Sequence, residues 1–122
     1  MNFHTRRLVQ PTDLNGSDRL FGGQLLSWVE EEAVNFAACR MQTREVVTRL
    51  VTQTEFLRPA RCGDVLELGM TVTEVGITSL SVHCVVRNKL SGATVLRIAR
   101  MVFVAVDEAG KPVAHEARQA VA

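Results

Sequence analysis

Residues 11–39, PTDLNGSDRLFGGQLLSWVEEEAVNFAAC, decide the fold that we expect for this 122-residue chain. The stretch opens with turn-forming residues, passes through Phe21, Gly22 and Gly23, and then becomes the only long segment with helical periodicity. We expect a helix from Gly22 or Gly23 to about Gln42, with extended segments after it. A single helix followed by a run of strands predicts a helix that a sheet wraps around.

The rest of the chain divides into extended runs separated by turn or stop signals at Pro59, Gly63, Gly76 and Gly92. We therefore predict an α+β fold in which one long helix packs against a five- or six-stranded antiparallel sheet. The length predicts a single domain over residues 1–122. The strands are expected at residues 4–10, 46–57, 65–75, 80–86 and 94–106, and residues 111–122 are expected to form a polar tail that frays.

Residues 94–106 are apolar on both faces of the predicted strand over much of their length. A strand with two apolar faces has to be covered on both sides. We expect the helix to cover one face and a second subunit the other, so the sequence predicts a dimer.

Composition excludes several classes of protein. A net charge of +1 argues against a nucleic-acid binder that depends on overall charge, and no window approaches the length of an apolar spanning helix. The N-terminal residues lack the apolar run of a signal peptide, so we expect a cytoplasmic protein. Its three cysteines are odd in number and lack a CxxC spacing, which predicts free thiols, with Cys39 and Cys84 buried.

A carboxylate cluster, Glu30, Glu31 and Glu32, interrupts the apolar sequence of the predicted helix. At about 100° per residue, Glu31 falls opposite the apolar stripe, whereas Glu30 and Glu32 fall at its two margins. A carboxylate in partly apolar surroundings can act as a general base or a nucleophile. The alternative is a solvated run of charge near the start of a helix, where negative charge is favourable.

The start of the same helix offers a second candidate feature. The free N–H groups of Gly22, Gly23 and Gln24 carry the positive end of the helix dipole, and the glycines allow a ligand to approach the backbone closely. Such a place can hold a carbonyl oxygen as it becomes an oxyanion. A helix entry with glycines chosen for packing explains the sequence equally well.

Other constellations are weaker. The three histidines are far apart and have no metal-ligand spacing, and the sequence lacks GxSxG, GxGxxG and P-loop motifs. Arg58 and Arg61, on either side of Pro59, could hold phosphates by charge-assisted hydrogen bonds. Surface solubility accounts for these arginines at least as well.

Four motifs in order carry a resemblance to a known family. They are PxDxN (Pro11, Asp13, Asn15), FGG at residues 21–23 followed by LLSWVEE, FLRPARCGD at residues 56–64, and VGITSLSV at residues 75–82. Together they resemble the hotdog-fold acyl-CoA thioesterases of the cytosolic acyl-CoA hydrolase type, over roughly residues 5–108. The resemblance implies a hotdog fold whose subunits pair their sheets, with acyl-CoA bound between subunits.

The resemblance also implies roles for individual residues. Glu30 occupies the position of the catalytic acid, which is usually aspartate in the family, and Asn15 is expected to come from the opposite subunit. Gly22 and Gly23 would polarise the thioester carbonyl through their N–H groups, next to Phe21. The CoA-binding residues implied are Arg58 near the phosphates and Thr78 and Ser79 near the pantetheine or nucleotide. Many relatives have a basic residue where this chain has Ile77.

The function that the resemblance implies is hydrolysis of acyl-CoA to a free fatty acid or other carboxylic acid and CoA, within fatty acid metabolism. No metal or redox cofactor is implied, since coenzyme A is part of the substrate. Partners are further copies of the chain, as dimers that assemble into tetramers or hexamers, with no nucleic acid and no membrane. The alternative is a catalytically silent module that binds or senses acyl-CoA on the same fold. An acyl carrier dehydratase would want a histidine close before the helix, and His4 is too remote.

Overall fold

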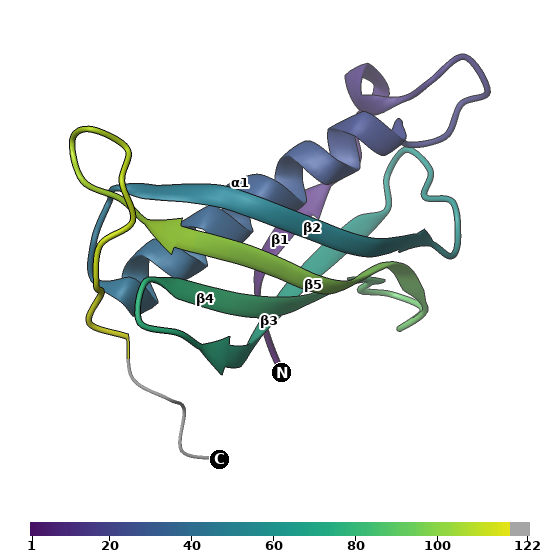
Figure 1. Cartoon of the computed structure of the whole chain (residues 1–122). Coiled ribbons are helices and arrows are strands. Elements are labelled where there is room, and N and C mark those ends of the chain that lie inside the picture. The colour runs from purple at the N-terminus through teal and green to yellow at the C-terminus, as the bar shows by residue number, and fades with distance from the viewer. Residues whose placement is uncertain (118–122) are drawn as a thin grey trace.

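The computed structural model describes residues 1–117. One long helix lies across a curved five-stranded sheet (Figure 1), which confirms the predicted α+β architecture. The helix lies within one residue of each predicted end, and the third strand has the predicted bounds. The elements are β1 (Asn2–Leu8), a short 3₁₀ turn (Pro11–Asp13), α1 (Gly22–Met41), β2 (Val46–Phe56), β3 (Val65–Val75), β4 (Ser79–Asn88) and β5 (Thr94–Ala105).

The sheet is antiparallel throughout, with strand order β1-β3-β4-β5-β2. The first two strands in sequence are therefore the two edges, and β3, β4 and β5 lie between them. Helix α1 begins beside the end of β2 and ends beside its start (Figure 1). This arrangement places the helix start next to residues 56–60.

One face of α1 forms the centre of the core. Leu25, Val29, Ala33 and Ala37 repeat every four residues and are all buried, because residues four apart lie on the same side of a helix. The two alanines are fully buried, and their small side chains let the helix approach the sheet closely. Leu26, next to this stripe on the helix, remains 36% exposed.

The inward positions of β4 follow the predicted alternation, since Leu80, Val82, Cys84 and Val86 are all fully buried. Burial also raises the pKa of the Cys84 thiol to about 12. The large apolar residues of β5 are buried as well, but not in the way predicted. Val102 and Val104 are buried within the single chain, so the double apolar face of β5 is not the surface that requires a second subunit.

The tail after β5 is partly docked on the molecule. The N–H of Val113 donates to the carbonyl of Ala105 at 2.9 Å, and the N–H of His115 donates to Ile77 at 3.1 Å. The prediction of a fraying tail is therefore wrong up to residue 117, and its last part lies outside the described residues. No helix in residues 1–117 is long and apolar enough to cross a membrane.

Candidate active site at the start of the central helix

The first turn of α1 presents two backbone donors. Phe21 is the N-cap residue in an extended conformation, and no side chain caps the helix. Within residues 1–117, no hydrogen bond to a protein acceptor is made by the N–H of Gly22 or Gly23. The prediction that the N–H of Gln24 is also free is wrong, because this group donates to the carbonyl of Phe21 at 3.0 Å. Two amides remain for a ligand, at the positive end of the helix dipole.

Two phenyl rings frame these amides. A Cβ atom added to Gly23 would lie 2.6 Å from Cε2 of Phe21, so the ring leaves no room for a side chain there. A Cβ atom on Gly22 would lie 3.4 Å from Cε1 of Phe56, at the end of β2. Both rings are more than half exposed. The close approach that the glycine pair suggested is thus partly an approach of these rings to the helix backbone.

A cleft of about 290 Å³ opens beside the helix start. It brings together three residues predicted from the sequence, Asn15, Gly22 and Arg58. The buried part of the wall is apolar, and polar side chains lie toward the opening. The complete lining is Asn15, Arg19, Leu20, Gly22, Leu25, Phe56, Leu57, Arg58, Pro59, Ala60 and Val95.

Asn15 holds its own loop with one end of its amide. Its Oδ1 accepts the N–H groups of Ser17 at 2.9 Å and Arg19 at 3.2 Å. The remaining polar group of the side chain is the NH₂, which donates hydrogen bonds and does not accept them. Asn15 can therefore offer donors to a ligand in the cleft, in addition to the backbone amides.

Glu30 lies on the side of α1 that faces β2. Its Oε1 accepts a hydrogen bond from Oγ1 of Thr48 at 3.3 Å. Its side chain is exposed, so within the single chain the partly apolar surroundings expected for Glu30 at the margin of the stripe are not found. Thr48 was not predicted as a site residue, since the β-bulge after it hides the alternation of β2 in the sequence.

The other two carboxylates of the cluster bind β1 on the opposite side of α1. Glu31 pairs with Arg7 at 2.9 Å, and Glu32 accepts the hydroxyl hydrogen bond of Thr5 at 2.9 Å. Glu31 is thus exposed, as predicted, but paired. Of the three carboxylates, Glu30 is the one on the β2 side.

The predicted CoA-binding residues are not brought together in one chain. Nη1 of Arg58 donates to the carbonyl of Thr94 at 2.7 Å, at the start of β5. Ser79 pairs with Val104 near the other end of β5, and Thr78 precedes it. Ten residues of strand span about 33 Å, which separates Thr78 and Ser79 from Arg58 by the length of the sheet.

A second cavity, of about 820 Å³, lies between the C-terminal half of α1 and strands β1 and β3. Of the candidate residues from the sequence it contains only Glu32, the carboxylate at the other margin of the apolar stripe. Cys39 lines it and is exposed, so the predicted burial of this thiol is wrong. Among residues 1–117, no three histidine, cysteine or carboxylate side chains gather closely enough to hold a metal ion.

Comparisons with known proteins agree with the fold and with the family resemblance. The family model described as "Thioesterase superfamily" matches residues 18–95. An uncharacterized acyl-CoA thioester hydrolase of Bacillus subtilis, YkhA, is 36% identical over 108 residues, covering 86% of this chain and 62% of the relative. This chain therefore spans less than two thirds of that relative's length. The acyl-CoA thioester hydrolase YciA of Salmonella typhimurium is 32% identical over 113 residues, covering 88% of this chain and 84% of the relative.

Solved structures show the same fold. The hexameric thioesterase y2039 of Yersinia pestis superposes with a TM-score of 0.85 at 32% identity, covering 93% of this chain and 94% of that one. An acyl-CoA hydrolase of Staphylococcus aureus, solved with butyryl coenzyme A and coenzyme A, gives 0.81 at 28% identity, covering 95% and 71%. Variants of that enzyme replace an asparagine, an aspartate fifteen positions later, and a threonine seventeen positions after the aspartate by alanine.

These likenesses confirm the predicted hotdog fold and the resemblance on which it was based. The family model covers well over half of the chain, from the loop before α1 to the start of β5. The curated relatives YkhA and YciA are named acyl-CoA thioester hydrolases. This chain therefore belongs to the thioesterase superfamily.

Proposed function

We propose that this chain hydrolyses acyl-CoA thioesters to a free carboxylic acid and CoA. One observation carries the proposal: two backbone amides without a protein acceptor, those of Gly22 and Gly23, adjoin the cleft that also contains Asn15. Donors fixed in this way stabilise a carbonyl oxygen as it gains negative charge. The names of the relatives support the substrate class.

The catalytic carboxylate has to come from a second copy of the chain. Glu30 lies eight residues after Gly22, which is about 12 Å along a helix. A glutamate side chain does not reach across that distance to a carbonyl held at the helix start. An isolated chain therefore presents the two halves of the reaction at separate places, and a partner subunit would join them.

The exposed surface beside β2 suggests how the partner lies. We call this surface the β2 seam: Leu26 of α1 with Val47, Leu50, Val51 and Phe56 of β2, all at least 36% exposed. Phe56 lies against Gly22, and Thr48 bonds Glu30. A two-fold axis midway between these contacts, near Leu26 and Thr52, would bring Gly22 beside Glu30 of the partner subunit.

The reaction then follows from the groups present. The thioester oxygen accepts the N–H groups of Gly22 and Gly23, and Asn15 donates from the cleft. Glu30 of the partner subunit either removes a proton from a water that attacks the carbonyl carbon, or attacks that carbon itself to form an anhydride that water opens. The C–S bond breaks and CoA leaves as a thiolate. Thr48 would fix the orientation of the carboxylate.

The solved relatives support this assignment. Asn15 precedes Glu30 by the same fifteen positions that separate the asparagine and aspartate changed in the Staphylococcus aureus enzyme, and Thr48 follows Glu30 by eighteen positions, against seventeen there. This chain has glutamate instead of aspartate, which moves the carboxylate by about one methylene. The hexameric relative supports assembly of dimers into a larger oligomer.

The same two-fold arrangement accounts for the separated CoA-binding residues. Antiparallel pairing of two β2 edges would turn the Thr78 and Ser79 end of the partner subunit toward Arg58. Arg58 would bind phosphate, while Thr78 and Ser79 of the partner subunit would approach the nucleotide. No other cofactor is needed for this chemistry, and the protein would act in the cytoplasm on acyl-CoA of fatty acid metabolism.

Replacing one carboxylate tests the proposal against a silent acyl-CoA-binding module. Glu30→Gln should lower kcat for acyl-CoA hydrolysis by about 100-fold or more, the scale for loss of a general base, while acyl-CoA still binds. Glu31→Gln is the matched control, since Glu31 is adjacent but pairs with Arg7 on the other side of α1. Release of free thiol and calorimetric binding measure the two properties. Equal turnover of wild type and Glu30→Gln would reject the assignment.

A further inference from the structure

Two arginines line the helix-start cleft and form no ion pair with a described carboxylate. Five arginines form ion pairs with glutamates: Arg6, Arg7, Arg87, Arg97 and Arg100. Arg19 and Arg58 both line the cleft beside Gly22. In the described part of the chain, no carboxylate oxygen lies within 4.0 Å of either guanidinium.

Each guanidinium makes one hydrogen bond to a backbone carbonyl, and Nη1 of Arg19 donates to the carbonyl of Ser17 at 3.4 Å. Arg58 donates one N–H from Nη1 to the carbonyl of Thr94 at 2.7 Å. Arg19 lies in a loop closed by Asn15, whose N–H donates to the carbonyl of Arg19 at 2.7 Å and whose Oδ1 accepts the N–H of Arg19. A guanidinium has five N–H donors, so each arginine keeps most of its donors for another acceptor.

One acidic side chain of the helix entry, Asp13, is already engaged. Asp13 accepts the side-chain amide of Gln24 at 2.9 Å through one oxygen and the N–H of Gln10 at 2.8 Å through the other. It therefore contributes its hydrogen bonds to the loop and not to the arginines. The cleft combines an apolar wall, two guanidiniums with spare donors and the positive end of a helix dipole.

We propose that Arg19 acts with Arg58 as an anion-binding pair for an oxyanion carried by the thioester substrate. The inference rests on the proposed function and adds Arg19, a residue outside the motifs, to the substrate-binding site. Planar guanidiniums bind phosphate and carboxylate oxygens through two parallel hydrogen bonds. The oxyanion is either a phosphate of CoA or a carboxylate at the far end of the acyl chain.

Four substrates separate these two sources. Hexanoyl-CoA and adipyl-CoA have acyl chains of equal length, but only adipyl carries a terminal carboxylate, and their N-acetylcysteamine thioesters lack every phosphate. Arg19→Gln should raise KM about tenfold for substrates that carry the recognised anion and leave kcat nearly unchanged, the scale for a lost charge-assisted hydrogen bond. A rise in KM for both CoA esters identifies a CoA phosphate as the recognised anion. A rise in KM for both adipyl esters identifies the terminal carboxylate.

Arg61→Gln is the matched control, because Arg61 lies in the same loop as Arg58 but does not line the cleft. Arg19→Lys should recover part of the loss, since lysine keeps the charge without the planar fork. If Arg19→Gln changes KM equally for all four substrates, or for none of them, the proposal of an anion-binding pair is wrong. If wild type hydrolyses none of the four, the proposed function fails. The Kd of each thioester for wild type and Arg19→Gln, measured by calorimetry, then decides the anion pair on its own.

Discussion

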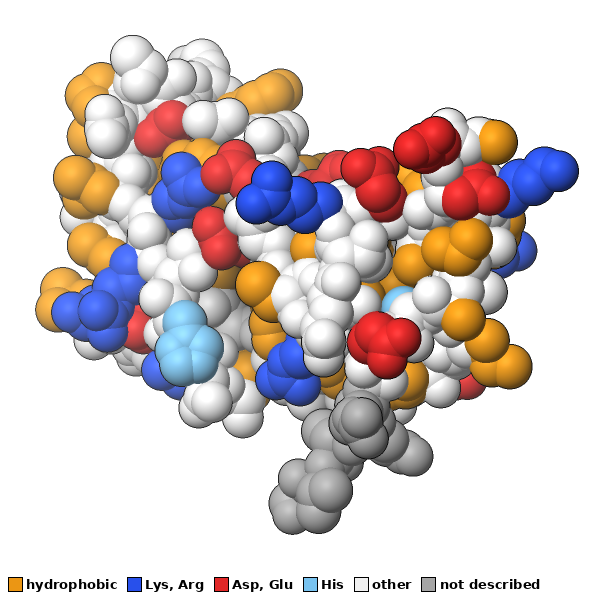
Figure 2. Space-filling view, turned by 90° about the vertical axis from the view of Figure 1, so that its left-hand side faces the viewer, with side chains coloured by type: hydrophobic (Ala, Val, Ile, Leu, Met, Phe, Trp, Pro, Cys, Tyr) orange, Lys and Arg blue, Asp and Glu red, His pale blue; other side chains and the backbone are white. Residues whose placement is uncertain are grey.

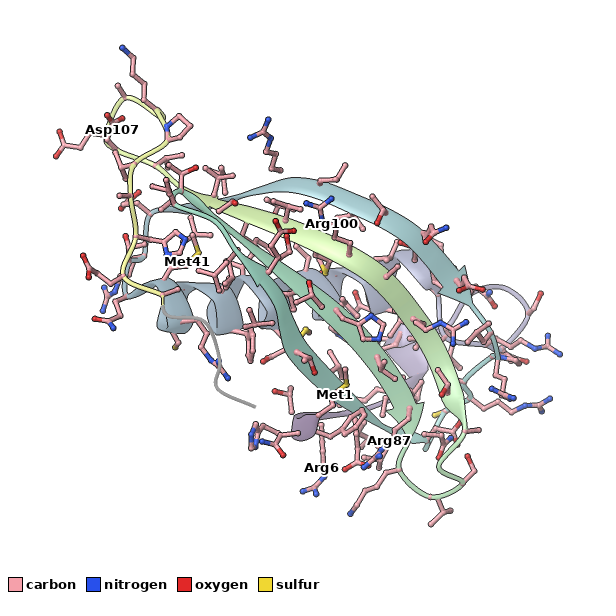
Figure 3. All side chains as sticks on the ribbon, turned by 60° about the horizontal axis from the view of Figure 1, so that its bottom comes forward. Met1, Arg6, Met41, Arg87, Arg100 and Asp107 are labelled. Atoms are coloured by element: carbon pink, nitrogen blue, oxygen red, sulfur yellow. The ribbon has the colours of Figure 1, made fainter. Side chains whose placement is uncertain are left out.

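The two edge strands of the sheet, β1 and β2, carry different kinds of side chain. At the β1 edge, Arg6 and Arg87 flank Glu67 at 3.3 and 3.2 Å, and Arg6 and Arg87 lie close together beside Met1 (Figure 3). At the β2 edge, the β2 seam leaves apolar side chains exposed next to the only carboxylate of the helix cluster that faces that way. Edge strands that expose unpaired backbone invite pairing with another chain. Both β1 and β2 are edge strands, and the comparison favours the β2 edge, with its exposed apolar seam, as the one at which a second subunit pairs.

Strand β1 also forms ion pairs with the helix. Arg7 contacts Glu31 at 2.9 Å and Glu32 at 3.8 Å, so the side of α1 facing β1 is fastened by charge. On the face of the molecule in Figure 2, cationic and acidic side chains both occur, and several acidic side chains gather toward the upper right. The β2 side of the helix has no such ion pair in the described residues, and its one polar contact joins Glu30 to Thr48.

A charge placed in the β2 seam should have the largest effect, and that effect should be on self-association. Val51→Lys places an ammonium in the β2 seam, where a partner would bury it, so self-association should weaken by about 100-fold or more and hydrolysis should fall with it. Leu8→Lys is the control, because Leu8 is a similarly exposed apolar residue on β1. Sedimentation over a range of concentrations measures both. An oligomer that survives Val51→Lys but dissociates with Leu8→Lys would reverse the comparison.

The ion pairs of Glu67 with Arg6 and Arg87, at the β1 edge, should control the stability of the fold in acid. Burial alone would raise the pKa of Glu67, but hydrogen bonds and charge from Arg87 and Arg6 hold it below its ordinary value of 4.5. Its stabilising effect is therefore present above that value and is lost as pH falls through the lower pKa of the folded protein. Glu67→Gln should lower Tm at pH 7 and reduce the fall of Tm below pH 4.5. Parallel Tm curves for the two proteins would contradict this.

Relief of backbone strain in β2 should have the smallest effect, and that effect should be on the free energy of unfolding. Gln53 has a φ of 40° within β2, in the left-handed region that favours glycine. Gln53→Gly should stabilise the protein by about 0.5 kcal/mol, since relief of roughly 1–2 kcal/mol is partly offset by the entropy of glycine in the unfolded chain. Thr52→Gly should destabilise, because its backbone is not in that region and it loses the hydrogen bond to Arg100. Denaturant titration distinguishes the two signs.

The sequence predicts the elements of this fold better than their neighbours in space. Helix α1 and strand β3 have nearly the predicted bounds, since glycines mark the start of the helix and lie on both sides of the strand. Strand order is not written in these local signals, so the separation of Thr78 and Ser79 from Arg58 was missed. The exposure of Glu30 was missed for a related reason, because a helical wheel shows the face but not whether the chain itself covers it.

The candidate site was predicted in the same uneven way. Motif residues located Asn15, Gly22 and Glu30, and the structure places the first two at one cleft. Thr48 and Arg19 carry no local signal: the first is identified by a hydrogen bond across 18 residues, and the second by a cleft that its loop forms with residues 56–60. Interactions of this kind depend on tertiary packing, which periodicity and motif spacing do not specify.

Subunit exchange between two inactive variants tests the central claim most directly. Asn15→Asp keeps an oxygen to hold the N–H groups of Ser17 and Arg19 but removes the NH₂ donor, and Glu30→Gln removes the carboxylate. Each should be nearly inactive alone. If the donors and the carboxylate of one site come from different subunits, random mixing of equal amounts should restore about a quarter of wild-type hydrolysis, because half of the dimers then contain one intact site. Mixed oligomers as inactive as the separate variants would contradict the account.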